Sequence, residues 1–216
     1  MNIYPKTKHE KLRLTILLIL LFGIFIYQYA IPFYWYKKYI PEEADIIFQS
    51  LPKMDLVEAI EGVTKSPYSH VGILIKKNDS WYVREAIIDV HDTPLFKWII
   101  RGRLNEFAVF RLKKKWQSTI PDFINATEKY MGRPYDVKYE LDDTKIYCSE
   151  LVYKSFKDAT NKNLGKLVAL GNMNWQPYED TIKKYEEGEP PLDRLMVSPR
   201  HLSESEYLQK VFSNGL

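Results

Sequence analysis

The sequence predicts an α+β protein: one domain with an antiparallel sheet and flanking helices, preceded by a single hydrophobic helix. An uncharged stretch of 23 residues lies near the N-terminus, short β-type runs follow between residues 44 and 112, and helical patterns stand around them. Helices grouped beside an antiparallel sheet are typical of the α+β class. No repeat or Gly/Ser-rich linker divides residues 40–216, so we expect one domain there.

The uncharged stretch, residues 14–36, is long enough to cross a membrane as a helix, which takes about 20 apolar residues. It ends in Tyr34, Trp35 and Tyr36, an aromatic cluster typical of the membrane–water interface. A cleaved signal peptide is one alternative, but the stretch is long and no small-residue cleavage site follows it. A buried globular helix fits less well, because every side of the segment is apolar. We therefore predict a transmembrane anchor.

Basic residues around this segment predict its orientation. Four of them precede the segment within residues 1–13, and two follow it directly. The excess of Lys and Arg stays on the cytoplasmic side. We therefore expect a cytoplasmic stub at 1–13, an anchor at 14–36, and a domain at 40–216 outside the cytoplasm, in the periplasm if the source is bacterial.

Charge and cysteine content exclude several classes of protein. The net charge is +3, but residues 1–39 hold six basic residues and one acidic residue, which leaves 25 basic and 27 acidic residues for the rest. A slightly acidic body does not suit nucleic acid, which is bound by clustered Lys and Arg. The single cysteine, Cys148, excludes an internal disulfide, a Cys-rich zinc site and an N-terminal lipoprotein cysteine.

The body shows a series of short periodic elements. Apolar residues recur every two residues in the expected strands and about every 3.6 residues in the expected helices. Gly, Pro and clusters of polar residues mark the ends of these elements. The expected elements are a strand at 44–48, a helix over 54–63, strands at 70–75 and 81–88 joined by a polar turn, a β run at 107–112, helices over 121–130 and from Cys148 onward, and a charged segment at 178–189 followed by a helix-like stretch at 202–212.

Cys148 and His70 are the first candidates for chemistry. Cys148 lies at the expected start of a helix, where unpaired N–H groups and the helix dipole favour the nucleophilic thiolate. His70 begins an apolar strand, from which an imidazole can project at the sheet edge. A buried structural cysteine and a structural histidine are the alternatives. The other histidines, His9, His91 and His201, lie in less informative positions.

Glu85 is the third candidate. Strand alternation places it on one face with Trp81, Val83 and Ile87. A carboxylate among apolar neighbours is costly unless it is paired or hydrogen-bonded. A structural pairing with an arginine would satisfy it, and so would an imidazolium, the arrangement that orients a catalytic base.

The segments ADIIFQS, SPYSHVGILI, REAI, GRPYD and YCSELVYKSF, in this order, resemble the YiiX-type branch of the NlpC/P60 cysteine hydrolases. This family has a circularly permuted papain-like fold. In ordinary papain-like enzymes the cysteine precedes the histidine, whereas here His70 precedes Cys148 by 78 residues, as permutation requires. The resemblance runs from about Ala44 to the tail, where MVSP is similar to a late element of the family, and excludes the membrane segment.

The resemblance implies a role for each matching residue. Cys148 corresponds to the nucleophile, His70 to its general base, and Glu85 to the residue that orients the base. Tyr135 in GRPYD corresponds to a tyrosine that assists the oxyanion site, although a core aromatic residue is an equal alternative for it. The backbone N–H of Cys148 is a further oxyanion donor. The mechanism requires no metal and no cofactor.

Three functions remain open from the sequence. The first is a membrane-anchored cysteine amidase or peptidase that cleaves an amide through an acyl-enzyme, with a peptide or other amide as substrate. The second is an acyltransferase or lipid amide or ester hydrolase of the lecithin:retinol acyltransferase-like kind, with an acyl lipid as partner. The third is a non-catalytic binding module. The complete nucleophile, base and orienting acid argue against the third, and the sequence does not separate the first two.

Overall fold

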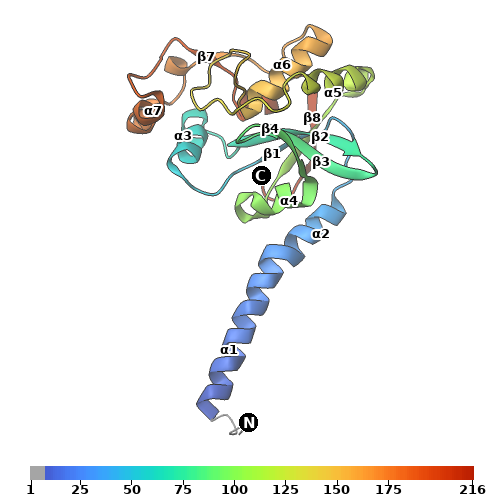
Figure 1. Ribbon diagram of the computed structural model, residues 1–216, viewed down its shortest axis with the longest axis vertical. Helices are drawn as coiled ribbons and strands as arrows, with labels where there is room; N and C mark the ends of the chain where they lie inside the picture. Colours follow the sequence, from blue (N-terminus) through green and yellow to red (C-terminus); the bar gives the residue numbers. More distant parts are fainter. Residues whose placement is uncertain (1–7) are drawn as a thin grey trace.

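A six-stranded antiparallel sheet in the order β4-β3-β2-β1-β5-β8 organises the body of the protein in this computed structural model, which describes residues 8–216 (Figure 1). Every neighbouring pair of strands in it is antiparallel. The strands are β1 (Ile46–Gln49), β2 (His70–Lys77), β3 (Ser80–Ala86), β4 (Val90–Pro94), β5 (Ala108–Leu112) and β8 (Leu208–Ser213).

Local sequence explains the centre of the sheet. All four residues of β1 are buried, because helices cover both faces of this apolar run. The β2–β3 hairpin turns at Asn78 and Asp79, which both adopt positive φ angles, of 46° and 60°. A two-residue turn of this kind matches the twist of the strands, and Asn and Asp tolerate its backbone conformation.

Helices form a layer on each face of the sheet (Figure 1). On one face, α6 packs Val152 and Phe156 against Phe48 and Ile73. On the other face, α4 packs Trp98 against the strands. The helices of the body are α3 (Asp55–Thr64), α4 (Leu95–Arg101), α5 (Ile120–Glu128), α6 (Cys148–Thr160), α7 (Glu179–Glu186) and α8 (Pro199–Ser203).

Smaller elements lie between these helices. A two-stranded sheet pairs β6 (Val168–Ala169) with β7 (Leu195–Met196), and α3 lies against α7. Short 3₁₀ turns occupy η2 (Arg103–Asn105), η3 (Lys114–Thr119), η4 (Leu170–Asn172) and η5 (Gln176–Tyr178). The predicted α+β class, with an antiparallel sheet and flanking helices, is confirmed.

The helix-like stretch expected at 202–212 is wrong. A short helix, α8, ends at Ser203, and Leu208–Ser213 forms the edge strand β8. Leu208 packs into the core, and the ring of Phe212 stacks on that of Phe107 at 5.0 Å between centroids. The pattern of a short apolar run does not distinguish a helix from a strand. Here residues 208–213 form a strand because they pair with the free edge of β5.

A long helix, Lys8–Lys38, precedes the body. It comprises α1 (Lys8–Phe25), a π-helical turn η1 (Ile26–Ala30) and α2 (Ile31–Lys38), and it extends beyond both ends of the expected segment 14–36. Its most apolar window has a mean hydropathy of 2.3 and is not buried by the rest of the chain. It is therefore long and apolar enough to cross a membrane. The first seven residues of the expected stub, 1–13, lie outside the described residues.

The C-terminal end of this helix is packed against the body. Phe96 of α4 contacts the rings of Phe33 and Tyr36 edge-on, at centroid distances of 6.1 and 5.7 Å. The next residue after α2, Tyr39, lies in the core beneath α4, and its hydroxyl donates to Asp45 Oδ2 at 2.5 Å. A buried tyrosine thus connects the long helix to the body of the protein.

We expect Tyr39→Ala to lower the free energy of unfolding by about 3–5 kcal/mol, because it removes a buried aromatic ring and leaves a cavity. Tyr39→Phe should cost about 1.5–3 kcal/mol, since it loses one hydrogen bond to a buried carboxylate and keeps the ring. The control is Ile40→Ala at a position that is 78 % exposed. Thermal unfolding in micelles measures all three, and equal midpoints for Tyr39→Ala and Ile40→Ala would contradict this account.

Candidate active site

Cys148 is the first residue of α6, and its thiol is buried and free. Contacts on both sides of it fix the start of this helix. The backbone N–H of Tyr147 donates to Glu150 Oε2 at 3.2 Å, and the Ser149 hydroxyl donates to the Val197 carbonyl at 2.8 Å. The thiol is therefore held at a helix N-terminus, as the sequence predicts.

His70 is the first residue of β2, and only 2 % of its side chain is exposed. Its Nε2 lies 2.5 Å from Glu85 Oε2. The Cys148 side chain lies close enough to the imidazole to raise its pKa. Since Nε2 is occupied by the carboxylate, Nδ1 is the nitrogen left for the thiol. One imidazole ring thus joins the cysteine to the glutamate.

Glu85 lies near the C-terminal end of β3, on the sheet face covered by α4, and its side chain is fully buried. Besides His70, its carboxylate accepts from Thr93 Oγ1 at 2.6 Å, from Trp98 Nε1 at 3.0 Å and from the Arg101 guanidinium. Burial raises the pKa of this carboxyl, but the hydrogen bonds and charges of His70 and Arg101 outweigh it and hold the pKa well below its usual range. Glu85 is therefore ionised, and both partners considered from the sequence are present.

Gly72 of β2 lies close to β3, where residues 83–85 leave no space for a side chain at this position. A Cβ at this position would lie 2.3 Å from Val83 Cγ1 and 2.9 Å from the Arg84 carbonyl oxygen. Such contacts are far inside van der Waals range, so a larger residue would push β3 away from β2. The position of Glu85 relative to His70 depends on this glycine.

The environment of His70 favours the imidazolium. Burial lowers the pKa of the ring, but its hydrogen bonds and charge interactions with Cys148 and Glu85 outweigh burial and raise the pKa to about 9. A histidine with this pKa is protonated at neutral pH. The arrangement can therefore hold a proton on His70, next to the sulfur atom, while the carboxylate balances its charge.

Two tyrosines lie near the thiol. The hydroxyls of Tyr135 and Tyr139 are 3.2 Å apart. Burial raises the pKa of both phenols, and the nearby charge of the Cys148 side chain raises them further. The structure thus brings Tyr135 to the site, and it adds Tyr139 beside it. Of two paired hydroxyls, one donates to the other, which leaves one proton free for a ligand.

The structure brings together all four residues singled out from the sequence: Cys148, His70, Glu85 and Tyr135. Sequence reasoning missed four others that contact this group: Thr93, Trp98, Arg101 and Tyr139. Three of them lie in β4 and α4, where the sequence shows no clear periodicity, and Tyr139 lies in a loop. Only their contacts in the folded chain connect them to the site.

Comparison with known proteins identifies the family of this chain. Residues 41–212 match the family model described as permuted papain-like amidase enzyme, YaeF/YiiX, C92 family. The chain is 30 % identical over 174 residues to a protein of Escherichia coli (strain K12) named "Uncharacterized protein YiiX", covering 79 % of this chain and 86 % of the relative. A crystal structure from Escherichia coli O157:H7, described as metalloprotein YiiX, superimposes with a TM-score of 0.77 at 30 % identity, covering 82 % of this chain and 99 % of that one.

This chain belongs to the permuted papain-like amidase family of the YaeF/YiiX type. The predicted permuted papain-like fold and the predicted cysteine-hydrolase class are confirmed, and the reading as a non-catalytic binding module is not retained. The family match covers the body and leaves the helix α1 outside it.

The description of the Escherichia coli structure as a metalloprotein raises the question of whether this chain has matching ligands. Within residues 8–216, no three His, Cys, Asp or Glu side chains are grouped so that they could hold a metal ion. The carboxylate of Glu85 is already engaged by His70, Trp98 and Arg101. The described residues therefore do not fit a metal site.

We expect Glu85→Gln to lower the pKa of His70 from about 9. The substitution removes a charge and a hydrogen bond that raise this pKa, and the burial that lowers it remains. NMR titration of histidine labelled at Cε1 measures the change. The control is Thr93→Val, which removes one donor to Glu85 but keeps the carboxylate charge, so that the His70 pKa should stay raised. An unchanged pKa in Glu85→Gln would show that the carboxylate does not act on the imidazole.

Proposed function

We propose that this permuted papain-like amidase hydrolyses an amide bond through a Cys148–His70–Glu85 triad and a covalent acyl-enzyme. One observation carries the proposal: a single buried imidazole contacts an ionised carboxylate and lies near enough to a free thiol at a helix N-terminus for the thiol to raise the pKa of the imidazole. This is the geometry of an activated nucleophile with an oriented base.

In the proposed reaction, the Cys148 thiolate attacks the carbonyl carbon of the substrate while His70 holds the proton. The C–S bond forms, and the carbonyl electron pair moves onto the oxygen. The backbone N–H of Cys148 and a hydroxyl of the Tyr135–Tyr139 pair are the donors for this oxyanion. Tyr135 is thus assigned to the oxyanion site, and Tyr139 supports it.

The tetrahedral intermediate then collapses and the C–N bond breaks. His70 donates its Nδ1 proton to the leaving nitrogen, which departs as an amine and leaves a thioester on Cys148. Water next gives a proton to His70 and attacks the thioester carbonyl. The C–S bond breaks, the acid is released, and the thiolate–imidazolium pair is restored. No step uses a metal ion.

Glu85 is a positioning residue in this scheme, because it acts on the substrate only through His70. Its carboxylate fixes which imidazole nitrogen faces the thiol and stabilises the imidazolium. Trp98 and Arg101 hold the carboxylate in turn, and the rings of Trp98 and His70 lie 6.2 Å apart between centroids. Glu85, Trp98 and Arg101 together thus hold the imidazole of His70 in its orientation.

We also propose that the helix Lys8–Lys38 anchors the enzyme in a membrane, with the N-terminus in the cytoplasm and residues 40–216 outside it. Its length and apolar surface support the span. The four basic residues before position 14 and two after position 36 support the orientation. The aromatic residues at its end, which lie at the junction with the body, suit the membrane–water interface.

We expect Cys148→Ser and His70→Gln each to lower kcat/KM for an amide substrate by at least about a hundredfold, and Cys148→Ser to eliminate alkylation by iodoacetamide at neutral pH. The control is His91→Gln, whose side chain is 40 % exposed and pairs with Asp89, and which should keep full activity. Thermal midpoints of the variants show that they are folded. Turnover by a folded Cys148→Ser variant near the wild-type rate would exclude the proposed nucleophile.

For topology, we expect a reporter enzyme that works only outside the cytoplasm to be active when it is fused after Leu216. The same reporter fused after Arg13 should be inactive, because that position precedes the span. Protease added to spheroplasts should digest the body of the full chain. An active reporter at Arg13, together with a body that is protected from protease, would show that the orientation is the opposite of the one proposed.

A further inference from the structure

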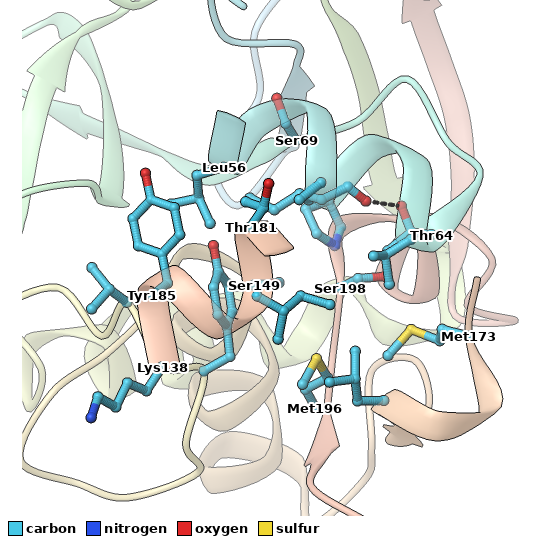
Figure 2. Close-up of a pocket in the computed structure, with 18 of the residues that line it drawn as sticks. Leu56, Thr64, Ser69, Lys138, Ser149, Met173, Thr181, Tyr185, Met196 and Ser198 are labelled. Atoms are coloured by element: carbon cyan, nitrogen blue, oxygen red, sulfur yellow. Dashed lines mark hydrogen bonds between the residues drawn. The ribbon is translucent and has the colours of Figure 1, made fainter. Parts of the chain in front are cut away.

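A polar pocket of about 840 Å³, including the part open to solvent, lies near the site and takes no part in the proposed reaction. It is bounded by the C-terminal end of α3, by η4 and by α8. Val63, Thr64 and Met173 line both this polar pocket and the apolar pocket between α3 and α7, which borders Cys148. Figure 2 shows Thr64 and Met173 at the end of the apolar pocket away from Tyr185. The two pockets therefore meet at that end.

Three cationic side chains line the polar pocket. Those of Lys65 and Lys166 have no ion-pair or hydrogen-bond partner within residues 8–216. Arg200 donates from Nε to Glu204 Oε1 at 2.7 Å and from Nη1 to the Thr64 carbonyl at 2.6 Å. These bonds fix the guanidinium and leave its Nη2 without a partner in the described chain. Glu204 is the one acidic residue of the lining, which therefore carries a charge of +2, whereas residues 40–216 as a whole are slightly acidic.

His201 supplies a neutral donor to the same pocket. Only 7 % of this residue is exposed. Its Nδ1 accepts from the Ser198 N–H at 3.3 Å, so the neutral ring carries its proton on Nε2, which has no hydrogen-bond partner among the described residues. Burial and the nearby charges of Lys166 and Arg200 lower the pKa of this ring, and Glu204 only partly opposes them. The ring therefore stays neutral at neutral pH and keeps its Nε2–H.

The carbonyl groups at the end of α3 do not stand in the way of an anion. A helix C-terminus repels negative charge where its carbonyl groups are free. Here Asn174 donates from its backbone N–H to the Val63 carbonyl at 3.1 Å and from its side chain to the Gly62 carbonyl at 3.2 Å. The Thr64 carbonyl accepts from Arg200. The cations of the pocket are therefore not offset by these three carbonyl groups.

The segment before β6 is packed closely against α8. Gly165 has a φ angle of 85°, and a Cβ there would lie 2.5 Å from the His201 carbonyl oxygen. A larger residue would push this segment away from α8. The contact keeps the next residue, Lys166, beside His201, and both line the polar pocket. The donors of the pocket thus stand on elements that are fixed relative to one another.

We propose that the polar pocket binds a phosphate group, carried by a soluble phosphomonoester. Such a group has a charge of about −1.5 to −2 at pH 7 and three strong acceptor oxygens, which match the charge and the donors of the lining. Lys166, the Nη2 of Arg200 and the Nε2–H of His201 are separate donors for these oxygens. A carboxylate carries a single charge and leaves part of the lining unpaired. The inference goes beyond the proposed function, because binding requires no amide cleavage.

The place of the pocket favours a soluble ligand over a lipid headgroup. Val168 of β6 lines the pocket, and β6 pairs with β7. Figure 1 shows β7 on the side of the body away from α1. If α1 crosses the bilayer, as we propose, the pocket therefore lies away from the membrane surface. Only this choice of source rests on the proposed anchor.

The test measures binding of sn-glycerol 3-phosphate to the full chain in dodecyl maltoside micelles, by titration calorimetry at about pH 7.5, where the ester is a dianion. We expect a Kd below about 1 mM, and binding of glycerate that is at least about tenfold weaker. Lys166→Ala should weaken binding of the ester about tenfold, because it removes a charged donor. Glu204→Gln should strengthen it, because the carboxylate of the lining is lost. The matched control is Lys162→Ala, at an exposed position that does not line the pocket, and it should leave the Kd unchanged.

NMR of histidine labelled with nitrogen-15 locates the bound ester. The Nε2 resonance of His201 should move when the ester is added, and that of His91 on β4 should not. No measurable binding, an unmoved His201 resonance, or equal weakening by Lys166→Ala and Lys162→Ala overturns the phosphate site and leaves the proposed function intact. If phosphatidic acid in phosphatidylcholine vesicles displaces the ester from the full chain, the pocket takes a lipid headgroup and the soluble source is overturned.

Discussion

The structure of the site depends on burying one ionised carboxylate, that of Glu85. A buried charge is stable only if it is paired and hydrogen-bonded, and Glu85 receives donors from three elements. His70 comes from β2, Thr93 from β4, and Trp98 and Arg101 from α4. This carboxylate thus links β4 and α4 to the sheet, in addition to the apolar contacts of α4. The imidazole orientation, on which the proposed reaction depends, is one consequence of the same set of contacts.

Helix α4 connects this carboxylate to the N-terminal helix. Trp98 and Arg101 of α4 face Glu85, whereas Phe96 contacts the rings of Phe33 and Tyr36 in α2. The end of the N-terminal helix therefore covers the outer side of the helix that supports Glu85. Helix α6, which carries Cys148, lies on the opposite face of the sheet (Figure 1). One face of the sheet therefore carries the contacts of Glu85 with α4, and the other face carries the helix that holds the thiol of Cys148.

The side chains around Cys148 are charged on one side and mainly apolar on the other. Toward His70 lie an imidazolium and a carboxylate, which suit proton transfer to a leaving nitrogen. Toward the pocket between α3 and α7 lie mainly aliphatic and thioether side chains. An apolar wall next to the reacting atoms also excludes water, and charge interactions are stronger where water is excluded.

The sequence determined the local features of this protein. Alternation placed Glu85 on a buried face, and the start of a helical pattern placed Cys148 at a helix N-terminus, because both depend on near neighbours in the chain. Length and hydropathy likewise determined the N-terminal helix. The order of His70 and Cys148, with the family resemblance, predicted the permuted fold.

Only the tertiary structure decided the contacts between distant segments. The partners Trp98 and Arg101 could not be predicted, since no local period marks a donor to a carboxylate on another strand. Residues 208–213 became a strand because the edge of β5 was free to pair, not because of their own pattern. The apolar pocket arises where α3 and α7, far apart in the sequence, pack together beside the thiol. Its shape is a property of that packing and has no signature in either helix alone.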